Sequence, residues 1–173
     1  NRCAVVQPGV TNLSITRAVQ GDGFYYAPDP SSQVACTIGG NVAENSGGIH
    51  CLKYGLTTNN LLGVEFVLMN GKRLRFGGKA MDAPGLDLLG LITGSEGLLG
   101  IVTEVTVRLR RVPPRTEALL LAFRTVEDAG ACVAGIISNG IIPAAMEIMD
   151  RFAIDAIEAY CAPGYPPDAG AVL

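Results

Sequence analysis

Tryptophan is absent from this sequence of 173 residues, histidine occurs once, and only 17% of the residues are charged. One histidine cannot build a multi-histidine metal site. The net charge of −3 and the pI of about 5.1 offer no basic face for sequence-independent binding to nucleic acid. Apolar residues make up 49% of the chain, which excludes an intrinsically disordered protein. No apolar run approaches the ~18 residues of a membrane-spanning helix, so the sequence predicts a globular chain without a transmembrane segment.

The cysteines are few, odd in number and far apart, and no two of them form a Cys-x-x-Cys pair. This spacing argues against a disulfide framework or a zinc cage. No signal peptide opens the chain, so we expect a cytoplasmic protein whose cysteines are small buried hydrophobes. The chain starts at Asn1 rather than Met and ends at Leu173 in an apolar run that resembles a new strand. We therefore expect both ends to be cut from a longer chain.

Short strands and helices are predicted along the first part of the chain. Cys3–Val6 is typical of a strand that enters a turn at Pro8-Gly9, and Leu13–Gln20 is typical of a helix. Two apolar runs, 61–69 and 73–76, flank Asn70-Gly71, which is a strong signal for a β-hairpin.

A second helix and a half-buried strand are expected further on. Leu86–Ile92 suits a short buried helix. Ile101–Arg110 alternates in polarity, which predicts that one face of a strand carries Ile101, Thr103, Val105, Val107 and Leu109.

Pro113-Pro114 is the predicted domain boundary, and it separates residues 1–112 from residues 113–173. Beyond it the pattern changes to strand, helix, strand and helix, over 118–123, 126–137, 145–149 and 152–160. In the last helix Phe152, Ala156 and Tyr160 share the face that we expect to be buried. This β-α-β-α order predicts an α+β layer.

Two glycine-rich segments carry the chemistry that residues alone suggest. In Thr37–Asn41 two glycines allow a sharp turn, and Gly94–Gly100 is a second glycine loop whose one fixed charge is Glu96. Backbone without a Cβ can approach a ligand and turn its N–H groups toward an anion. A helical turn over 41–46 would point its N-terminus at the first bend and favour a phosphate. Tight turns without a ligand explain the same glycines, so the residues alone leave both readings open.

Several familiar nucleotide and catalytic motifs are missing. The chain has no Gly-x-Gly-x-x-Gly after a strand, no P-loop and no Gly-x-Ser-x-Gly. Nothing in it qualifies as a catalytic base, and no metal ligands stand out. Arg151 could clamp a carboxylate or could equally be a solvated arginine on a helix face.

Four ordered motifs give the sequence a family resemblance. Pro28-Asp29-Pro30-Ser31-Ser32, the segment 37–48, Lys53-Tyr54-Gly55 and the segment 94–104 resemble the FAD-linked oxidases of the vanillyl-alcohol-oxidase type. Within that family they look most like the glycolate-oxidase group, with D-lactate and D-2-hydroxyglutarate dehydrogenases close by. The resemblance runs from about Val5 to Met149.

The resemblance implies an α+β fold. Residues 1–112 would be the second half of a PCMH-type FAD-binding domain, and 113–173 the beginning of an α+β substrate-binding cap. It further implies FAD as the cofactor, and oxidation of a 2-hydroxy acid to the 2-oxo acid with hydride transfer to flavin N5. The residues that would line the cofactor are Pro28, Asp29, Pro30, Ser31, Thr37, Ile38, Gly39, Gly40, Asn41, Asn45, Gly47, Gly48, Tyr54, Gly55, Glu96, Gly97, Gly100, Ile101 and Val102.

The resemblance also implies what this chain does not contain. The N-terminal half of the flavin domain has no counterpart here, and the histidines, metal ligands and substrate-binding arginine of the cap would lie past Leu173. The partners implied are the missing halves of the parent chain and other subunits of a glycolate-oxidase-like complex, in the cytoplasm or at the periphery of the inner membrane.

Three alternatives remain beside this reading. The flavin domain of a molybdenum hydroxylase shares the Thr-Ile-Gly-Gly-Asn element but resembles this chain poorly around Ser95-Glu96-Gly97. A non-catalytic flavin-domain remnant would bind FAD weakly or not at all. His50 is either an exposed polar loop residue or a group with an acid–base or covalent flavin role.

Overall fold

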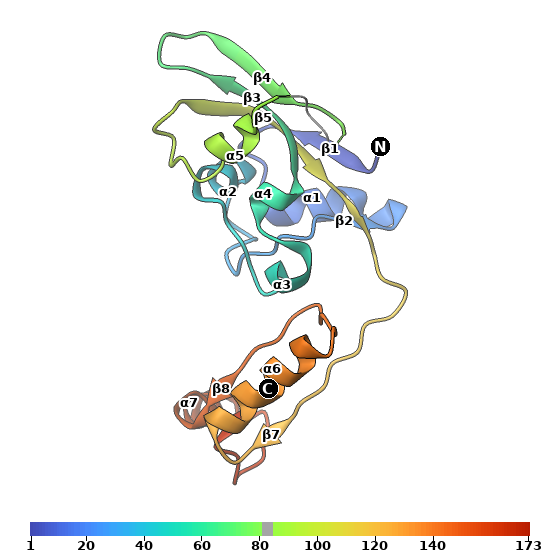
Figure 1. Cartoon of the computed structure of the whole chain (residues 1–173), viewed down its shortest axis with the longest axis vertical. Helices are drawn as coiled ribbons and strands as arrows, with labels where there is room; N and C mark the ends of the chain where they lie inside the picture. The colour runs from blue at the N-terminus through green and yellow to red at the C-terminus, as the bar shows by residue number, and fades with distance from the viewer. Residues whose placement is uncertain (81–84) are drawn as a thin grey trace. The chain divides into compact units, whose positions relative to one another are not determined.

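The computed structural model describes residues 1–80 and 85–173, which divide into two compact units, Asn1–Pro113 and Pro114–Leu173. The first unit contains an antiparallel sheet of four strands in the order β1-β5-β3-β4, with helices packed on one face (Figure 1). Its strands are β1 (Cys3–Val6), β3 (Leu61–Val67), β4 (Arg73–Gly77) and β5 (Ile101–Arg108).

Short helices connect these strands. They are α1 (Asn12–Val19), the 3-10 helix η1 (Gln20–Asp22), α2 (Ile38–Glu44), α3 (Cys51–Tyr54), α4 (Thr57–Asn60) and α5 (Leu88–Ile92). A separate two-stranded ribbon pairs β2 (Phe24–Tyr25) with β6 (Arg110–Arg111).

The hydrophobic core of the first unit lies between the sheet and the helices. The buried members include Ile15 from α1, Ile38 and Val42 from α2, and Val105 and Val107 from β5. Side chains alternate across a strand, so Glu65 of β3 lies on the opposite face of the sheet from the buried Val64 and Phe66. Burial of this apolar layer fixes α2 against β5, and α2 forms one wall of the site described below.

The predicted strand 3–6 and the β-hairpin are confirmed, and the first helix is confirmed to within one residue. β3 and β4 pair from Gly63↔Gly77 to Val67↔Arg73, and the turn between them contains Asn70-Gly71, as expected. The helix predicted over 86–92 is present but begins two residues later, as α5 (Leu88–Ile92).

The prediction that alternate residues of β5 share one face is wrong at the start of the strand. Glu65 faces Glu104 and Phe66 faces Val102, so Thr103 is an extra residue that interrupts the alternation. As a result Val102 packs on the core while Ile101 is 61% exposed. From Val105 onward the predicted face is in the core, where Val105, Val107 and Leu109 are buried.

A charged network covers the other face of the sheet. The Glu65 carboxylate accepts a hydrogen bond from the Thr103 hydroxyl at 2.8 Å and forms an ion pair with Arg75 at 2.9 Å. Arg75 also bonds Glu104 at 2.7 Å. The Thr103 hydroxyl is the largest cause that lowers the pKa of Glu65, and Arg73 and Arg75 add to it.

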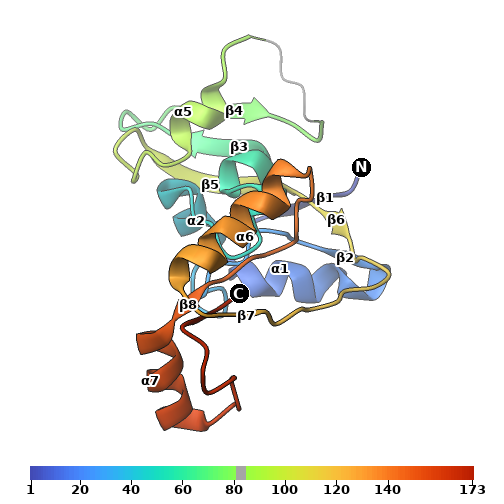
Figure 2. The same cartoon turned by 60° about the horizontal axis from the view of Figure 1, so that its bottom comes forward.

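The second unit combines two helices with a three-stranded sheet in the order β7-β9-β8. Its elements are β7 (Ala122–Phe123), α6 (Val126–Ser138), β8 (Met149–Asp150), α7 (Arg151–Cys161) and β9 (Ala171–Val172). Helix α6 lies beside β7 and β9, and α7 beside β8 and β9 (Figure 2). Its core is formed by Ile154, Ala169 and Val172, with Met149 packed against it.

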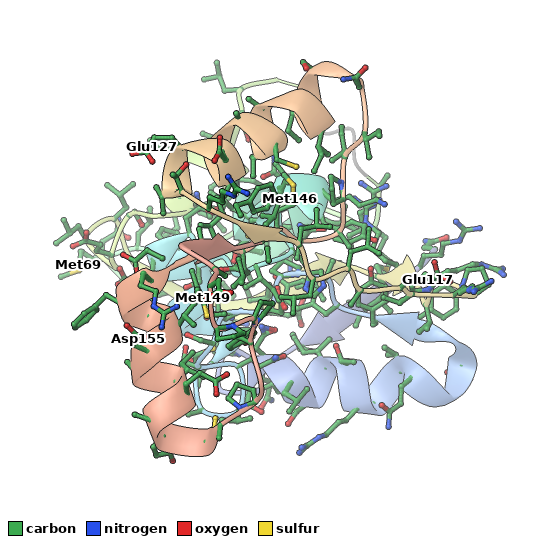
Figure 3. All side chains as sticks on the ribbon, turned by 90° about the horizontal axis from the view of Figure 1, so that it is seen from below. Met69, Glu117, Glu127, Met146, Met149 and Asp155 are labelled. Carbon is green, nitrogen blue, oxygen red and sulfur yellow. The ribbon has the colours of Figure 1, made fainter. Side chains whose placement is uncertain are left out.

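Three expectations for this unit are wrong. The strand predicted over 145–149 shares only Met149 with β8. The strand predicted over 118–123 is reduced to Ala122–Phe123, which pairs with Val172 and Ala171 of β9. In α7 the buried residue is Ile154, whereas Phe152 and Tyr160 are 82% and 90% exposed. The helix carries apolar residues on more than one face, and the sheet, which the sequence pattern does not reveal, selects the face of Ile154. Figure 3 shows Met149 and Asp155 close to the start of this helix.

The cysteines are more exposed than the sequence predicts. Four of the five cysteines are half-buried and Cys161 is exposed, so the expectation that they are buried is wrong, and all five are free. Within residues 1–80 and 85–173, no helix combines the length and hydropathy needed to span a bilayer.

Thr103→Val tests the charged network. In the folded state the pKa of Glu65 is lowered, so its contribution to stability is complete above the ordinary carboxyl value and is lost as the pH falls through the folded-state value. Removing the hydroxyl reduces that contribution, so the free energy of unfolding should depend less on pH in the acidic range. Urea denaturation at a series of pH values measures this. Thr103→Ser, which keeps the hydroxyl, should behave like the parent chain, and an unchanged acid dependence in Thr103→Val would contradict the network.

Ile154→Ala tests the choice of face in α7. Truncating this buried side chain should lower the free energy of unfolding of the second unit by about 2–5 kcal/mol. Phe152→Ala, two residues earlier on an exposed face of the helix, should change it by less than about 0.5 kcal/mol. Hydrogen exchange of the α7 amides, measured in both variants, compares them directly, and equal losses would show that the assigned face is wrong.

Candidate functional site

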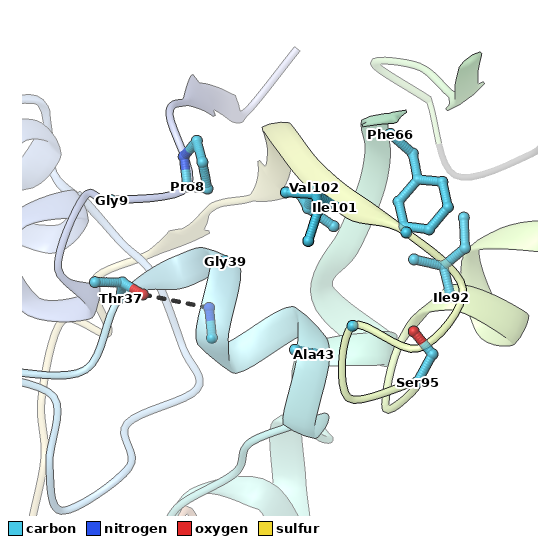
Figure 4. A pocket seen from close by; sticks show the side chains of 13 residues that line it. Pro8, Gly9, Thr37, Gly39, Ala43, Phe66, Ile92, Ser95, Ile101 and Val102 are labelled. Carbon is cyan, nitrogen blue, oxygen red and sulfur yellow. Dashed lines mark hydrogen bonds between the residues drawn. The ribbon is translucent and has the colours of Figure 1, made fainter. Parts of the chain in front are cut away.

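A cleft of about 390 Å³ lies in the first unit, between α2 and the loop that precedes β5 (Figure 4). It joins segments far apart in the sequence. The lining residues are Pro8, Gly9, Thr37, Gly39, Gly40, Ala43, Phe66, Ile92, Ser95, Gly97, Gly100, Ile101 and Val102. Both predicted glycine segments therefore contribute walls to one cleft.

Helix α2 begins earlier than expected, at Ile38 rather than at residue 41, because Thr37 caps it. Thr37 has an extended backbone, and its Oγ1 accepts a hydrogen bond from the Gly40 amide at 3.3 Å. Gly39 lies against the turn after β1, where a Cβ would stand 2.6 Å from the Pro8 Cβ. Glycine at this position allows the helix and the turn to touch.

The amides at the start of α2 are already used within the protein. The Ile38 amide donates to the Val10 carbonyl at 2.8 Å, and the Gly39 amide donates to the Pro8 carbonyl at 2.9 Å. The Gly40 amide is taken by Thr37. The expectation that a helix N-terminus over 41–46 offers free donors to a phosphate is therefore wrong.

The second glycine loop is held by the opposite end of the same helix. The Gly94 amide donates to the Val42 carbonyl at 2.8 Å and the Glu96 amide to the Ala43 carbonyl at 2.9 Å. Carbonyls in the last turn of a helix lack partners within the helix. The loop satisfies them, and in doing so it is placed beside α2.

Two glycines of this loop differ in what surrounds them. At Gly100 (φ +150°) a Cβ would stand 2.5 Å from the Val67 carbonyl oxygen, so this position is closed to side chains by the protein itself. At Gly97 (φ +76°) no atom lies within 4 Å of a Cβ. A side chain at Gly97 would project into open space beside the cleft, which is the behaviour expected of a residue that leaves room for a ligand.

Other residues of the two glycine segments have roles inside the protein. Ile38 is fully buried in the core. Asn41 is 2% exposed and outside the cleft, and its Nδ2 has no hydrogen-bond partner among the described residues. Asn45 ends α2 in a left-handed conformation, and its Oδ1 accepts from the Thr58 amide at 3.0 Å. Glu96 is also left-handed (φ +53°).

The remaining predicted residues form a second group away from the cleft. The buried Pro28 accepts a hydrogen bond from Asn12 Nδ2 at 2.8 Å. Asp29 Oδ2 bonds His50 Nδ1 at 2.5 Å, and Asp29 Oδ1 accepts from the His50 amide at 3.3 Å. Gly48 is closed to any side chain, since its Cβ would stand 2.1 Å from the Asp29 carbonyl oxygen.

An aromatic and cationic group adjoins this pair. Tyr54 meets Tyr25 edge to face at 6.2 Å between ring centroids, and the Arg110 guanidinium lies 5.6 Å from the Tyr54 ring. Burial is the main cause that raises the pKa of Tyr25, and the neighbouring Tyr54 adds to it.

Three of the four remaining predicted residues, Pro30, Gly47 and Gly55, contact other parts of the protein. Pro30 is buried and accepts from the Gln33 amide, whereas Ser31 is exposed. Gly47 packs against Cys51 and Leu56, and Gly55 (φ +78°) packs against Asn59.

Six lining residues escaped the sequence analysis as site residues: Pro8, Gly9, Ala43, Phe66, Ile92 and Ser95. Pro8-Gly9 carried a turn signal, and Ser95 lay inside the second glycine loop, so these could have been included. The sequence predicts Phe66 and Ile92 as ordinary core residues. No pattern in it indicates that part of each side chain lines a cleft.

The cleft suits a flat, largely apolar group. Its walls are glycine backbone and the side chains of Phe66, Ile92 and Val102, and the hydroxyls of Thr37 and Ser95 add polar contacts. Among residues 1–80 and 85–173, no cluster of histidine, cysteine or carboxylate side chains could hold a metal ion. The arrangement can therefore bind and orient a ring system.

Two protein families match this chain. Residues 1–77 match the FAD binding domain family, and residues 112–173 match the C-terminal domain of FAD linked oxidases. Glycolate oxidase subunit GlcD of Escherichia coli strain K12 is 58% identical over 172 residues, and its namesake from Bacillus subtilis strain 168 is 48% identical over 174 residues. These matches cover 99% and 100% of this chain, and 34% and 37% of the relatives.

More distant relatives agree with these matches. A D-lactate dehydrogenase of Archaeoglobus fulgidus is 36% identical over 90% of this chain and 35% of its own length. A solved structure of alkyldihydroxyacetonephosphate synthase superposes with a TM-score of 0.85 at 23% identity, over 99% of this chain and 34% of that one. The last likeness shows the fold alone.

The chain thus spans about a third of the length of the curated relatives that it matches. The matched families, the α+β architecture and the order of the glycine motifs agree with one another. The chain belongs to the FAD-linked oxidases, with residues 1–77 in their FAD binding domain and residues 112–173 in their C-terminal domain.

Proposed function

We propose that the protein containing this chain oxidises a 2-hydroxy acid of the glycolate type to the 2-oxo acid, with FAD as the electron acceptor. The observation that carries the proposal is the 58% identity, along the whole described sequence, to a protein named glycolate oxidase subunit GlcD. The meeting of both glycine segments in one cleft supports it independently.

The cleft fits part of the cofactor by its shape and chemistry. The absence of a side chain at Gly97 leaves room for a planar group, and Phe66 and Val102 give it apolar contact. FAD would supply the two-electron acceptor, at flavin N5. The protein would bind the flavin nucleotide, orient it and exclude water from the reacting atoms.

The pyrophosphate of FAD requires donors that α2 does not offer. The first three amides of this helix are bonded to Val10, Pro8 and Thr37. We propose that most pyrophosphate contacts come from parts of the protein outside these residues, so that residues 1–173 by themselves retain FAD weakly.

A second candidate is oxidation of D-lactate or D-2-hydroxyglutarate by the same chemistry. The 36% identity to a D-lactate dehydrogenase of Archaeoglobus fulgidus favours the lactate form. The relatives with the higher identities are named as subunits. We therefore also propose that the protein works with partner subunits.

Turnover by the full-length protein tests the proposed reaction. Glycolate, D-lactate and D-2-hydroxyglutarate are offered in turn, with a dye as final electron acceptor, and oxo-acid formation is measured. We expect glycolate to give the highest kcat/KM of the three. Preference for D-lactate or D-2-hydroxyglutarate would support the second candidate, and no oxidation of any 2-hydroxy acid by flavin-loaded protein would refute both.

Gly97→Val in the full-length protein tests the cleft. The valine would project into the open space beside it, so the bound flavin, measured from its absorbance after gel filtration, should fall at least about tenfold, the equivalent of 1.4 kcal/mol. Gly71→Val is the matched control, because Gly71 has nearly the same φ (+78°) and nothing within 4 Å of its Cβ, but lies in the β3–β4 turn. Equal flavin loss in both variants would attribute the effect to backbone strain and remove the cleft from the proposal.

A further inference from the structure

Strand β4 is an outer strand of the sheet in the first unit (Figure 1). It pairs with β3 from Gly63↔Gly77 to Val67↔Arg73, and among the described residues no strand pairs with its other side. In an antiparallel ladder, successive residues of a strand direct their backbone N–H and C=O groups toward opposite neighbours. Strand β4 therefore carries a row of backbone groups that face away from β3.

Two hydrogen bonds identify the residues of β4 that face outward. The Leu68 amide donates to the Lys72 carbonyl at 3.0 Å, and the Gly78 amide donates to the Leu62 carbonyl at 2.9 Å. Because the direction alternates along the strand, the even-numbered positions between these bonds face β3 and the odd-numbered positions face outward. The residues that offer a backbone N–H and C=O to an added strand are Arg73, Arg75 and Gly77.

This edge of the sheet is positively charged. Residues 66–80 contain four cations and no carboxylate, although acidic residues outnumber basic ones, 16 to 13, in the whole chain. Two carboxylates of the neighbouring strands, Glu65 and Glu104, pair with the arginines of β4. The charge is only partly neutralised, because the two arginine side chains remain 71% and 64% exposed. The four cations, all exposed, are Lys72, Arg73, Arg75 and Lys79.

The side chains of β4 alternate between two environments. Arg73 and Arg75 lie on the charged face of the sheet, whereas Leu74 and Phe76 are half-buried on the opposite face. Phe76 packs against the core and lines a hollow together with Leu89. A strand added beside β4 would place its own side chains alternately next to arginines and next to apolar groups. An extended segment in which acidic and apolar residues alternate fits this edge.

We propose that β4 is a docking edge for an extended acidic segment of a partner subunit, which adds a strand to the sheet through backbone hydrogen bonds. Backbone pairing supplies the affinity, and the cations select an acidic segment over a basic one. The inference rests on the association with partner subunits proposed above, and it is independent of the identity of the substrate.

Protection against aggregation explains the same charges differently. Natural sheets place charged residues on edge strands to keep other chains away. In that case β4 binds no added strand, and its cations affect solubility alone. A second alternative is that another segment of the full-length protein already covers β4, so that its outward amides are protected from hydrogen exchange without a partner. Either outcome would overturn the proposal.

A synthetic peptide of alternating glutamate and valine, titrated into the full-length protein, is the probe. Its binding, measured by fluorescence anisotropy of the labelled peptide, should weaken as the salt concentration rises. Hydrogen exchange resolved to single residues should be fast at the Arg73 and Arg75 amides of the free protein and slow in the complex.

Two further peptides separate strand pairing from general attraction. The glutamate peptide with N-methyl groups on alternate residues lacks the N–H groups that pair with β4, so it should bind at least about tenfold more weakly. A peptide of alternating lysine and valine should not bind. Absence of binding by the glutamate peptide, or equal binding by either of these peptides, would overturn the proposal.

Two substitutions at Arg73 separate charge from backbone pairing in the protein. Arg73→Gln keeps the outward N–H, and its binding should weaken by about twofold to fivefold, the effect of one exposed ion pair. Arg73→Pro also removes the N–H, at an edge position where proline is tolerated, and should weaken binding about fivefold further. Equal binding by the two variants would show that charge alone attracts the peptide.

Arg17→Gln is the matched control for the loss of one positive charge. Arg17 lies on an exposed side of α1, away from the sheet edge, so this variant should bind the glutamate peptide like the parent protein. A loss of binding equal to that of Arg73→Gln would show unspecific attraction by the whole protein and would overturn the docking edge.

Turnover of glycolate in the same preparations separates this proposal from the proposed function. Arg73→Pro should oxidise glycolate like the parent, because no residue of β4 lines the cleft. A parent protein that oxidises glycolate but binds no acidic peptide would overturn the docking edge alone. A parent protein that binds the peptide but oxidises no 2-hydroxy acid would refute the proposed function alone.

Discussion

The hydrogen bonds at the two ends of α2 are the constraint on which the rest of the first unit depends. At the start of the helix, Ile38 and Gly39 donate to the turn after β1, and at its end Val42 and Ala43 accept from the loop 94–100. A helix of seven residues leaves most of its terminal groups unsatisfied. Two distant segments, the turn after β1 and the loop 94–100, supply partners for these groups, at about 1 kcal/mol for each bond. The same bonds place those segments around one cleft.

This arrangement changes what the glycines do. Gly39 and Gly100 stand where a Cβ would collide with other parts of the protein, so they permit packing. Gly97 faces open space and can leave room for a ligand. The cleft is consequently a place for a ring system rather than a phosphate cradle. Membership in the FAD-linked oxidases agrees with this, because FAD contains two planar ring systems, the flavin and the adenine.

The Asp29–His50 pair is a contact between residues far apart in the sequence that only the fold reveals. The two residues are 21 positions apart and meet only because Gly48 lets the loop 28–32 approach α3. In the sequence His50 is the single histidine, between Ile49 and Cys51, and Asp29 is one residue of a proline-rich loop. Their chemistry depends on a distance that no local pattern encodes.

Local patterns by themselves determined the strand 3–6, the β3–β4 hairpin and the helix 12–19, since turn residues and periodicity act over a few positions. The ordered motifs also determined the family and the α+β class. Tertiary structure decided where the alternation of β5 breaks at Thr103 and which face of α7 is buried, because both depend on the neighbouring strand or sheet. It also decided that the amides at the start of α2 are already bonded, and that Asp29 and His50 meet. Hydrogen bonds and packing between distant segments set these features. Local sequence patterns do not reveal them, because the segments in contact are far apart along the chain.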